Sequence, residues 1–500
     1  MPKRSTARSV TIAPPTMGWN TVDPISTMDE RYAVEAVNFF SNGSTVDLRN
    51  GYTNHTTGIA AASICNGIFE LALQDGSRKL VGIGNDGAAY NCTTAGAASS
   101  LGAIGAAGTA QSRAVNFRNK LFIKQLDSGA SRDVYYWDGA GATVTAAAFT
   151  GPASDDKALR NISVYKSRLY LTGVDASVWY GGIDAITGAL TQFDVQSVLR
   201  LGGKLLYAGP AQKTGDINEN LFAFITDRGE VLLYSGSYPG DSGWQLVGQY
   251  FMPPPVGYNS FFNWGANLVI ITFQGLVLLA EVLKGASNLV FLSEKINDQF
   301  IATINTSLPD AVVGVFYPKG NLILISVNAG TDTGAQLVMN TITGSWWKWT
   351  ISTATMWGMW DDKLMLASRT GSNLMVVQRG DDGYSDLFDS SPLTRPIKLR
   401  PAYNYFGDRE STKQFIQAVP TMYQSEGLTL TMDADVDFAN VAATQTVTPN
   451  TADTAYKIYQ PKVGLKGIGK CASIRIDQSV TTKRMSIQAI EVQFNDGDIN

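Results

Sequence analysis

The chain has 500 residues, of which 44% are apolar and 16% charged, and its formal net charge is −4. So small a net charge gives no bulk attraction to nucleic acid or to an anionic membrane. The charged share lies below the roughly 25% of an ordinary soluble domain. Three cysteines, Cys65, Cys92 and Cys471, form an odd and sparse set. They argue against a disulfide framework and favour synthesis in a reducing cytoplasm.

Residues 1–60 are predicted to form an N-terminal arm that ends in a docking strand. The arm opens with the basic residues Lys3, Arg4 and Arg8, our candidates for an assembly contact, and has no apolar core of signal-peptide length. Its residues 28–40 have a helix-like apolar period, which predicts a short helix. Because the segment has too little apolar surface to fold alone, residues 1–20 are expected to order only against a neighbour: another subunit, an adjoining ring of an assembly, or the propeller.

A short apolar strand built around leucine recurs seven times, at steps of 41–54 residues. Most copies are followed by a second strand that runs into a turn. Two or more strands every 40–50 residues or so is the pitch of a β-propeller blade. We therefore predict an all-β fold in which residues 61–395 form a propeller of six or seven blades. The repeated leucines are Leu80, Leu121, Leu169, Leu221, Leu268, Leu322 and Leu364.

Four stretches within this region depart from the repeat. The Ala/Gly-rich tract over residues 95–110 predicts a long loop between blades. The apolar run over residues 267–283 is interrupted by Gln274 and Gly275, so it predicts two buried strands across a turn instead of a membrane helix. The stretch over residues 293–305 is a helix candidate. Three consecutive prolines, Pro253, Pro254 and Pro255, favour an extended linker.

A second proline-containing boundary lies near Ser390. Beyond it, alternating strand patterns continue at a spacing that differs from the propeller repeat. We therefore predict that residues 396–500 form a separate β-sandwich-like domain.

Residues that could carry catalysis are scarce. The only histidine, His55, lies in a polar stretch and is predicted to be an exposed loop residue. Zinc sites and Ser-His-Asp triads need a histidine held by partners. Neither a phosphate-binding loop nor a dinucleotide-binding glycine pattern is present. We therefore predict no enzymatic activity, no cofactor, no catalytic metal and no small-molecule substrate.

Three motifs allow a chemical as well as a structural interpretation. The turn from Asp241 to Trp244 partly resembles a sialidase aspartate box but occurs once, which favours a simple turn with a packed tryptophan. The alternating residues Asp433, Asp435 and Asp437 favour a solvated acidic strand edge over a Ca²⁺ site. The tryptophans of the GSWWKW motif favour blade packing over a stacking platform for nucleic acid or sugar. They are Trp346, Trp347 and Trp349.

The first 60 residues resemble the opening of the tail hub proteins of short-tailed phages, which include tail nozzles and packaged-DNA stabilisation proteins. The family pattern is a Gly-x-Asn element, a helix ending near an asparagine, a turn, and a strand with arginine followed by glycine. The stretches from Val178 and Leu337, and the pair KQFIQAVP and TMDADVDF, are also similar to the family. The matching residues of the opening are Gly18, Asn20, Asn38, Arg49 and Gly51.

The resemblance implies a structural virion protein made in the host cytoplasm. It implies a homohexameric ring below an adaptor ring or portal complex, beside tail fibres or spikes, through which double-stranded DNA passes without sequence-specific binding. We expect a channel that is not predominantly basic, with a gate made by protruding loops, and Pro253, Pro254 and Pro255 are candidates for that gate. Two alternatives stay open: a propeller that binds or degrades host glycans, and a bacterial propeller that serves as an interaction module.

Overall fold

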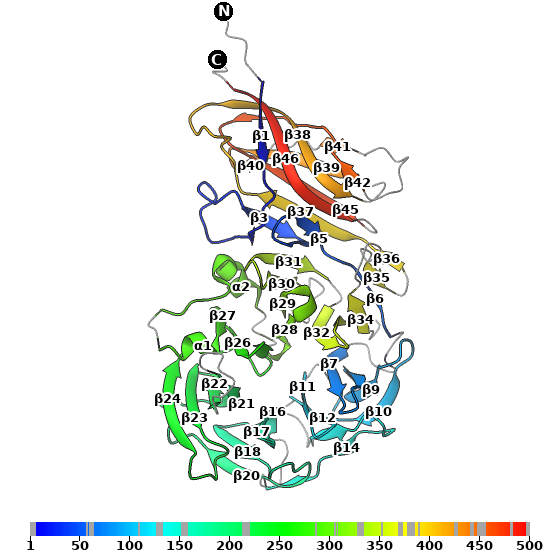
Figure 1. Ribbon diagram of the computed structural model, residues 1–500, viewed down its shortest axis with the longest axis vertical. Coiled ribbons are helices and arrows are strands. Elements are labelled where there is room, and N and C mark those ends of the chain that lie inside the picture. Colours follow the sequence, from blue (N-terminus) through cyan, green and yellow to red (C-terminus); the bar gives the residue numbers. More distant parts are fainter. Residues whose placement is uncertain are drawn as a thin grey trace, which may run out of the picture.

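The computed structural model describes most of the chain. The described residues are 7–56, 59, 65–108, 111–126, 134–151, 159–212, 221–285, 288–304, 307, 309–327, 335–351, 354–368, 374–377, 386–388, 391–424, 429–440, 445–447, 457–480 and 484–496. Within them β-strands are the main secondary structure and helices are few and short. Seven sheets stand around a common centre, and a two-layered sandwich lies against one side of this ring (Figure 1).

The ring is a seven-bladed β-propeller, which confirms the predicted fold class and fixes the number of blades. Each blade is an antiparallel sheet, and in blades 1–6 the strands follow one another in sequence. Blade 1 contains β7 (Cys65–Ala72), β8 (Arg78–Gly84), β9 (Ala88–Asn91) and β10 (Ser99–Ala103); blade 2 contains β11 (Ser112–Phe117), β12 (Lys120–Gln125), β13 (Tyr135–Trp137) and β14 (Thr145–Ala146); blade 3 contains β16 (Leu159–Tyr165), β17 (Arg168–Gly173), β18 (Ser177–Tyr180) and β20 (Thr191–Asp194).

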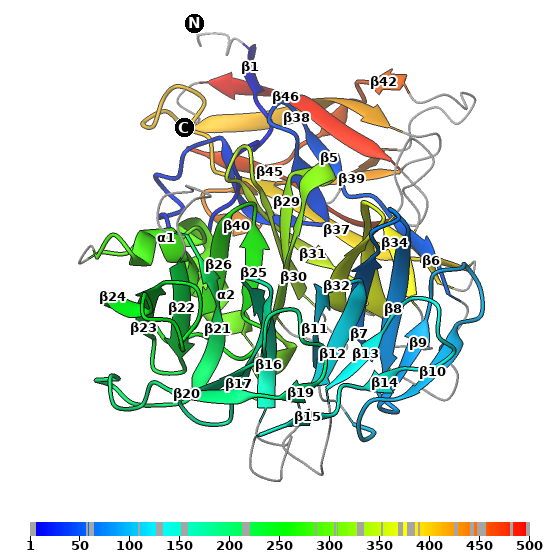
Figure 2. The same cartoon turned by 60° about the horizontal axis from the view of Figure 1, so that its bottom comes forward.

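The remaining four blades continue the circle (Figure 2). Blade 4 contains β21 (Leu205–Ala211), β22 (Leu221–Thr226), β23 (Glu230–Ser235) and β24 (Gln245–Phe251); blade 5 contains β25 (Phe261–Trp264), β26 (Asn267–Thr272) and β27 (Gly275–Leu278); blade 6 contains β28 (Val313–Tyr317), β29 (Leu322–Ser326), β30 (Ala335–Asn340) and β31 (Trp346–Thr350); blade 7 contains β32 (Ala354–Trp360), β33 (Lys363–Ser368), β34 (Leu374–Val377) and, from the N-terminal segment, β6 (Tyr52–Asn54).

The seven repeated leucines occupy equivalent places. Each lies in the second strand of its blade, where a neighbouring strand pairs with it on both sides. Six of the seven are buried, and Leu221 is partly buried. The repeat therefore marks the strand that carries each blade's contribution to the apolar layers between blades.

The sandwich consists of two sheets that pack face to face. One contains β1 (Ala7–Ile12), β4 (Phe39–Ser41), β5 (Val46–Leu48), β38 (Lys413–Gln424), β42 (Lys457–Tyr459), β43 (Val463–Gly464), β44 (Ile468–Gly469) and β46 (Met485–Asp496); the other contains β3 (Tyr32–Val37), β37 (Arg395–Pro401), β39 (Leu430–Val436), β40 (Ala439–Asn440), β41 (Gln445–Val447) and β45 (Ala472–Val480).

The two parts of the molecule share one continuous sheet. Strand β2 (Gly18–Trp19) bridges β31 of blade 6, and β3 pairs with β2 and β31 on one side and with β37 of the sandwich on the other. The result is an 11-stranded sheet that runs from the propeller into the sandwich. The N-terminal segment thus supplies strands to both parts.

The short remaining elements lie mostly at blade edges. Strands β15 (Phe149–Thr150) and β19 (Gly188–Ala189) pair with each other, and β35 (Asp386–Phe388) pairs with β36 (Ser391–Leu393) beside β6. No helix in the described part of the chain is long and apolar enough to cross a membrane. The helices are α1 (Leu279–Val282), η2 (Glu294–Ile296), α2 (Asn297–Thr303), η3 (Pro309–Ala311) and η4 (Pro318–Gly320).

Two local predictions were wrong. The helix expected over residues 28–40 is instead strands β3 and β4, because pairing with strands from other parts of the chain outweighs a weak helical period. The loop expected over residues 95–110 contains β10, the outermost strand of blade 1. The two strands predicted across Gln274 and Gly275 are confirmed as β26 and β27, and the helix near Ser293 is confirmed as α2.

The buried leucine of blade 6 gives a test of the repeat. Replacing Leu322, which is 6% exposed, by alanine removes packed methyl groups and leaves a cavity. We expect Leu322→Ala to lower the free energy of unfolding by about 2–5 kcal/mol, measured by urea denaturation. Ile342→Ala, at a side chain that is 74% exposed, is the matched control. Equal losses in the two variants would contradict the assignment of Leu322 to the core.

Candidate functional site at the domain junction

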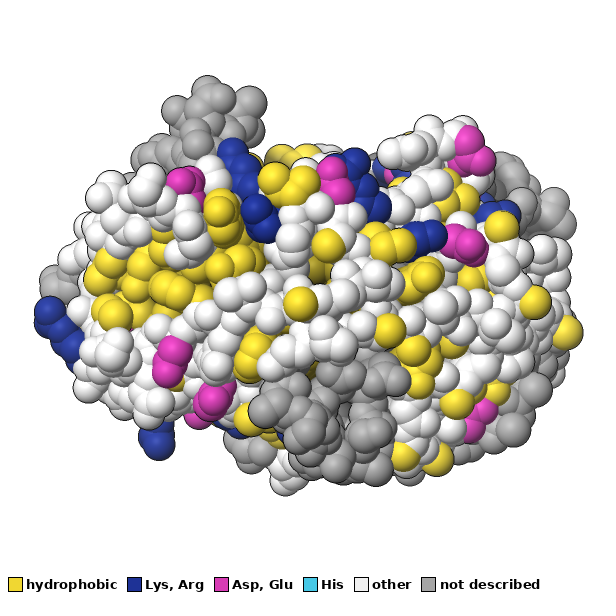
Figure 3. All heavy atoms as spheres, turned by 90° about the horizontal axis from the view of Figure 1, so that it is seen from below, with side chains coloured by type: hydrophobic (Ala, Val, Ile, Leu, Met, Phe, Trp, Pro, Cys, Tyr) yellow, Lys and Arg dark blue, Asp and Glu magenta, His cyan; other side chains and the backbone are white. Residues whose placement is uncertain are grey.

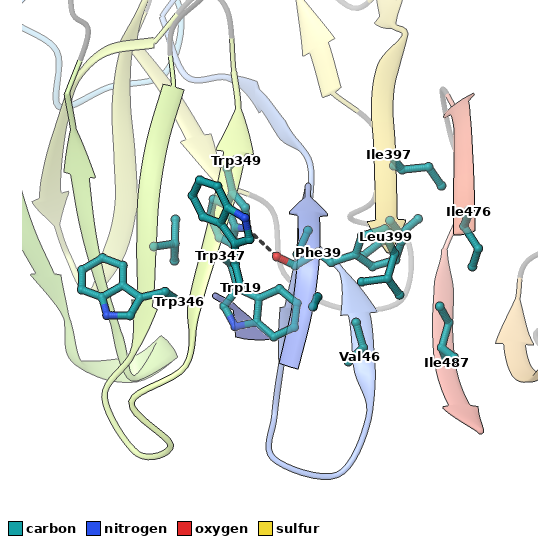
Figure 4. Packing of buried hydrophobic residues seen from close by; sticks show 14 of the residues in the cluster. Trp19, Phe39, Val46, Trp346, Trp347, Trp349, Ile397, Leu399, Ile476 and Ile487 are labelled. Carbon is teal, nitrogen blue, oxygen red and sulfur yellow. Dashed lines mark hydrogen bonds between the residues drawn. The ribbon is translucent and has the colours of Figure 1, made fainter. Parts of the chain in front are cut away.

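The tryptophans of the GSWWKW motif form the centre of the junction between propeller and sandwich (Figure 4). All three are at most 4% exposed, and each indole N–H donates to a protein oxygen. Trp349 bonds the carbonyl of Phe39 at 3.0 Å, and Trp346 bonds the carbonyl of Leu292 at 2.8 Å. Trp347 donates to the Ser345 hydroxyl at 3.0 Å. Rings so enclosed cannot stack on a ligand, which confirms the packing interpretation.

The glycine of the Gly-x-Asn element lets two backbones meet. Gly18 has φ +80°, and a Cβ built on it would lie 2.4 Å from the carbonyl oxygen of Trp346. Any side chain would therefore push β2 away from blade 6. Asn20 then turns the chain, because its side-chain oxygen accepts hydrogen bonds from the backbone N–H groups of Val22 and Asp23 at 3.1 and 3.0 Å.

Asn38 connects three parts of the structure at one point. Its amide nitrogen donates to the Thr350 hydroxyl of blade 6 at 2.8 Å and to the Pro396 carbonyl of the sandwich at 2.6 Å. Its amide oxygen accepts from Arg49 Nε at 2.9 Å. The residue has φ +62°, a left-handed conformation that asparagine tolerates better than most residues. Asn38 thus holds β31, β37 and the strand before Arg49 together.

Arg49 forms a buried ion pair with Asp386. Both side chains are at most 4% exposed, and Arg49 Nη1 donates to Asp386 Oδ1 at 2.8 Å. Arg395, also buried, donates to the Arg49 carbonyl at 2.9 Å and lies 3.7 Å from the same carboxylate. Sequence reasoning missed Asp386 and Arg395, since partners more than 330 residues apart leave no local signal. A buried charge pair of this kind is costly to break on one side.

A cavity of about 400 Å³ opens beside this junction, between the loop after β2 and the outer face of the shared sheet. Two carboxylates, Asp23 and Glu35, and the guanidinium of Arg400 line it. Asp23 accepts a hydrogen bond from the Asn20 amide and forms an ion pair with Lys295, and these contacts hold its pKa below the usual range. Asp23 is therefore ionised at neutral pH.

A second, more open cavity of about 590 Å³ lies on the sandwich side. Its wall includes Tyr403, Tyr405 and Arg409. The Arg409 guanidinium lies over the ring of Tyr405, 4.3 Å from its centroid, and the ring of Phe438 lies 4.6 Å from that of Tyr403 in a tilted arrangement. The wall also contains the acidic residues Asp29 and Glu30, so it combines aromatic rings with charges of both signs.

None of the described candidate residues for a gate or for an assembly contact lines either cavity. Pro253, Pro254 and Pro255 link blade 4 to blade 5, and Pro255 is buried and bridges Thr272. Pro253 and Pro254 are partly buried, and the role of the segment as a gate stays a prediction. Lys3 and Arg4 lie outside the described residues. Arg8 lies on β1, where it is 63% exposed and pairs with Asp496 at 2.7 Å.

His55 was predicted to be an exposed loop residue, and this was wrong. Its ring is half-buried beside Trp360, at 4.9 Å between centroids, and its Nε2 lies 2.9 Å from the carbonyl oxygen of Cys92. Burial lowers the pKa of His55. The Asp241–Trp244 turn was predicted correctly: the backbone N–H of Trp244 donates to the Asp241 carbonyl at 3.0 Å, and the Trp244 ring stacks on Tyr234.

The alternating aspartates do not form a solvated edge. Asp433 and Asp435 share one face of β39 but are 6% and 1% exposed, and they pair with Arg475 and Arg400 at 2.5 and 3.4 Å. Asp437 lies in the following turn. The arginines come from other strands, so no local sequence pattern indicates this pairing. Among the described residues, no group of three or more His, Cys, Asp or Glu could hold a metal ion.

No known family model matches this chain, and no curated protein does. Three solved structures resemble about two thirds of this chain at low sequence identity. The WD40 domain of Neurospora crassa Pan2 is 10% identical with a TM-score of 0.42, covering 67% of this chain and 98% of that one. The WD40 β-propeller domain of Doa1 is 11% identical with a TM-score of 0.41, covering 67% and 99%. The computationally designed Ika8 protein is 9% identical with a TM-score of 0.37, covering 65% and 99%.

The buried ion pair of the junction gives a second test. Arg49→Ala leaves the Asp386 carboxylate buried without its main partner, so we expect the free energy of unfolding to fall by about 3–5 kcal/mol. The control is Arg31→Ala, which removes an exposed ion pair with Asp29 and should leave stability unchanged. If Arg49→Ala were as stable as Arg31→Ala in denaturant titrations, the junction would not depend on this pair.

Proposed function

We propose that this chain is a structural subunit of a short-tailed phage tail, at the nozzle or hub, that assembles into a homohexameric ring. The ring retains the genome in the virion and then conducts it during ejection. It sits below an adaptor ring or portal complex and beside tail fibres or spikes. The proposal begins from the sequence resemblance and gains support from the place of the residues that carry it.

The observation that carries the proposal is the common location of those residues. Gly18, Asn20, Asn38 and Arg49 are all buried or tightly enclosed at the junction of propeller and sandwich. Each fixes backbone geometry there, and none faces open solvent as a ligand-binding group would. A protein whose motif residues fix the propeller and the sandwich relative to each other can hold its neighbours in an assembly at a fixed relative orientation. A catalyst would instead place such residues around a reacting group.

The charge of the chain also suits a DNA conduit. Duplex DNA carries about one negative charge per 1.7 Å of helix axis, so a wall rich in Lys and Arg would bind it and slow its passage. The chain has 39 Lys and Arg against 43 Asp and Glu. Many of the described basic side chains already pair with carboxylates, among them Arg475 with Asp433 and Arg400 with Asp435.

Electron microscopy of the purified chain tests this proposal. We expect closed rings, six-fold in class averages, with a channel wide enough for a DNA duplex and a lumen that is not densely lined by Arg and Lys. Tail preparations from virions should contain the same ring. A chain that stays monomeric at all concentrations tested, or a ring with a closed or strongly basic lumen, would overturn the proposal.

The junction cavity is the feature that a glycan-degrading protein would use, because it contains two carboxylates and an arginine. Glycosidases need one carboxyl group that is protonated at working pH. Asp23 does not fit that role, since its contacts with Asn20 and Lys295 lower its pKa. Glu35, which lies 3.9 Å from Lys398, is the remaining candidate.

We expect no release of reducing ends when the purified chain is incubated with host surface polysaccharide. Glu35→Gln, Asp23→Asn and the unrelated variant Asp241→Asn should give the same blank as the wild type. Turnover by the wild type that is lost in Glu35→Gln but kept in Asp241→Asn would favour the glycan-degrading alternative.

A further inference from the structure

The outer edges of the propeller blades differ in how they are protected. Among the described strands, blades 1, 2 and 3 end in strands of 5, 2 and 4 residues. Blade 5 ends in β27, which runs directly into α1. The outer strands of blades 6 and 7 pair with β2 and β35. Blade 4 alone presents a long outer strand, β24, with 7 residues and a described partner on one side only.

Strand β24 also lacks the features that keep an edge from pairing. Natural edges carry charges, prolines or short strands that discourage another strand from adding. The sequence of β24, QLVGQYF, contains neither a charged residue nor a proline. Leu246, Val247 and Phe251 are 41%, 46% and 47% exposed. So much apolar side chain on a free edge marks an interaction surface.

The surface extends onto the neighbouring loop. The backbone N–H of Leu201 donates to the Glu230 carboxylate of β23 at 2.7 Å, and Gln249 of β24 bonds the Val198 carbonyl at 3.3 Å. These bonds hold Leu201, which is 54% exposed, beside β24. Figure 3 shows apolar side chains gathered on the same side of the propeller on which Figure 1 places β22–β24.

A second uncharged edge, shorter than β24, lies on the opposite flank of the same molecule. Strand β10 of blade 1 is also outermost and uncharged, and Ser99, Ser100 and Ala103 are exposed. Figures 1 and 2 both place β24 and β10 on opposite sides of the propeller. The Leu101 carbonyl already accepts a hydrogen bond from Val144, so the free part of β10 is its two ends.

We propose that β24 of one copy packs against the β10 flank of the next copy, and that this contact repeats head to tail around the ring. This inference rests on the proposed ring and names its interface. Two different surfaces on opposite flanks give the heterologous contact that a closed cyclic ring requires. Because both strands are uncharged, their contact buries no unpaired charge.

Disulfide trapping tests the contact directly. Val247→Cys combined with Ser100→Cys should give, after mild oxidation, a ladder of covalent oligomers on a non-reducing gel. The native cysteines Cys65, Cys92 and Cys471 are buried and do not compete. The control pairs Val247→Cys with Ile342→Cys, at a side chain that is 74% exposed on the turn between β30 and β31. This pair should give no ladder.

A charge variant gives an independent measurement. Val247→Lys places a charge in the contact, so we expect at least a tenfold weaker assembly by analytical ultracentrifugation, with an unchanged melting temperature because the side chain is exposed. Ile342→Lys is the matched control and should assemble as the wild type does. Equal weakening by both variants would overturn the proposed interface.

The outcomes separate this inference from the proposed function. Rings in the electron microscope without the Val247–Ser100 ladder would overturn the interface and leave the ring standing. A wild-type chain that remains monomeric would overturn both. Rings together with the ladder, and their loss in Val247→Lys alone, support the β24–β10 contact.

Discussion

The structure depends on one buried polar junction, in which Asn38 and Arg49 tie the N-terminal segment to the propeller and the sandwich at once. Asn38 bonds Thr350 of blade 6 and Pro396 of the sandwich, and Arg49 pairs with Asp386 beside blade 7. Burying these groups is favourable only while every partner is present. The junction therefore specifies one relative placement of the propeller and the sandwich. Trp346, Trp347 and Trp349 pack in the arrangement that these polar contacts select.

The N-terminal segment also closes the propeller. Strand β6 completes blade 7 by pairing with β34, so the first and last parts of the ring are held by main-chain hydrogen bonds. The same segment supplies β2 and β3 to the shared sheet and β4 and β5 to the sandwich. Neither part of the molecule has its full set of strands without it. Because its strands are shared in this way, the molecule is suited to hold two neighbours in an assembly at a fixed relative orientation.

The propeller could be predicted from sequence because its signal is local and repeated. Each leucine occupies the same place in its blade, so the regular distance along the chain between the seven leucines was enough to show the architecture. The junction could not be predicted in the same way. Asn38 lies within a stretch with a helical apolar period, but the structure places it between two strands, where its partners Thr350 and Pro396 lie more than 300 residues away in sequence. The burial of Asp433 likewise depends on Arg475, which comes from another strand.

Native-state hydrogen exchange would test the central claim, that the N-terminal strands join propeller and sandwich into one cooperative unit. The account predicts that amides of β3 and β5 exchange only through global unfolding, as slowly as those of β29 in the propeller and β45 in the sandwich. Exchange of β3 and β5 that is much faster than in both parts, or different unfolding free energies for β29 and β45, would contradict it.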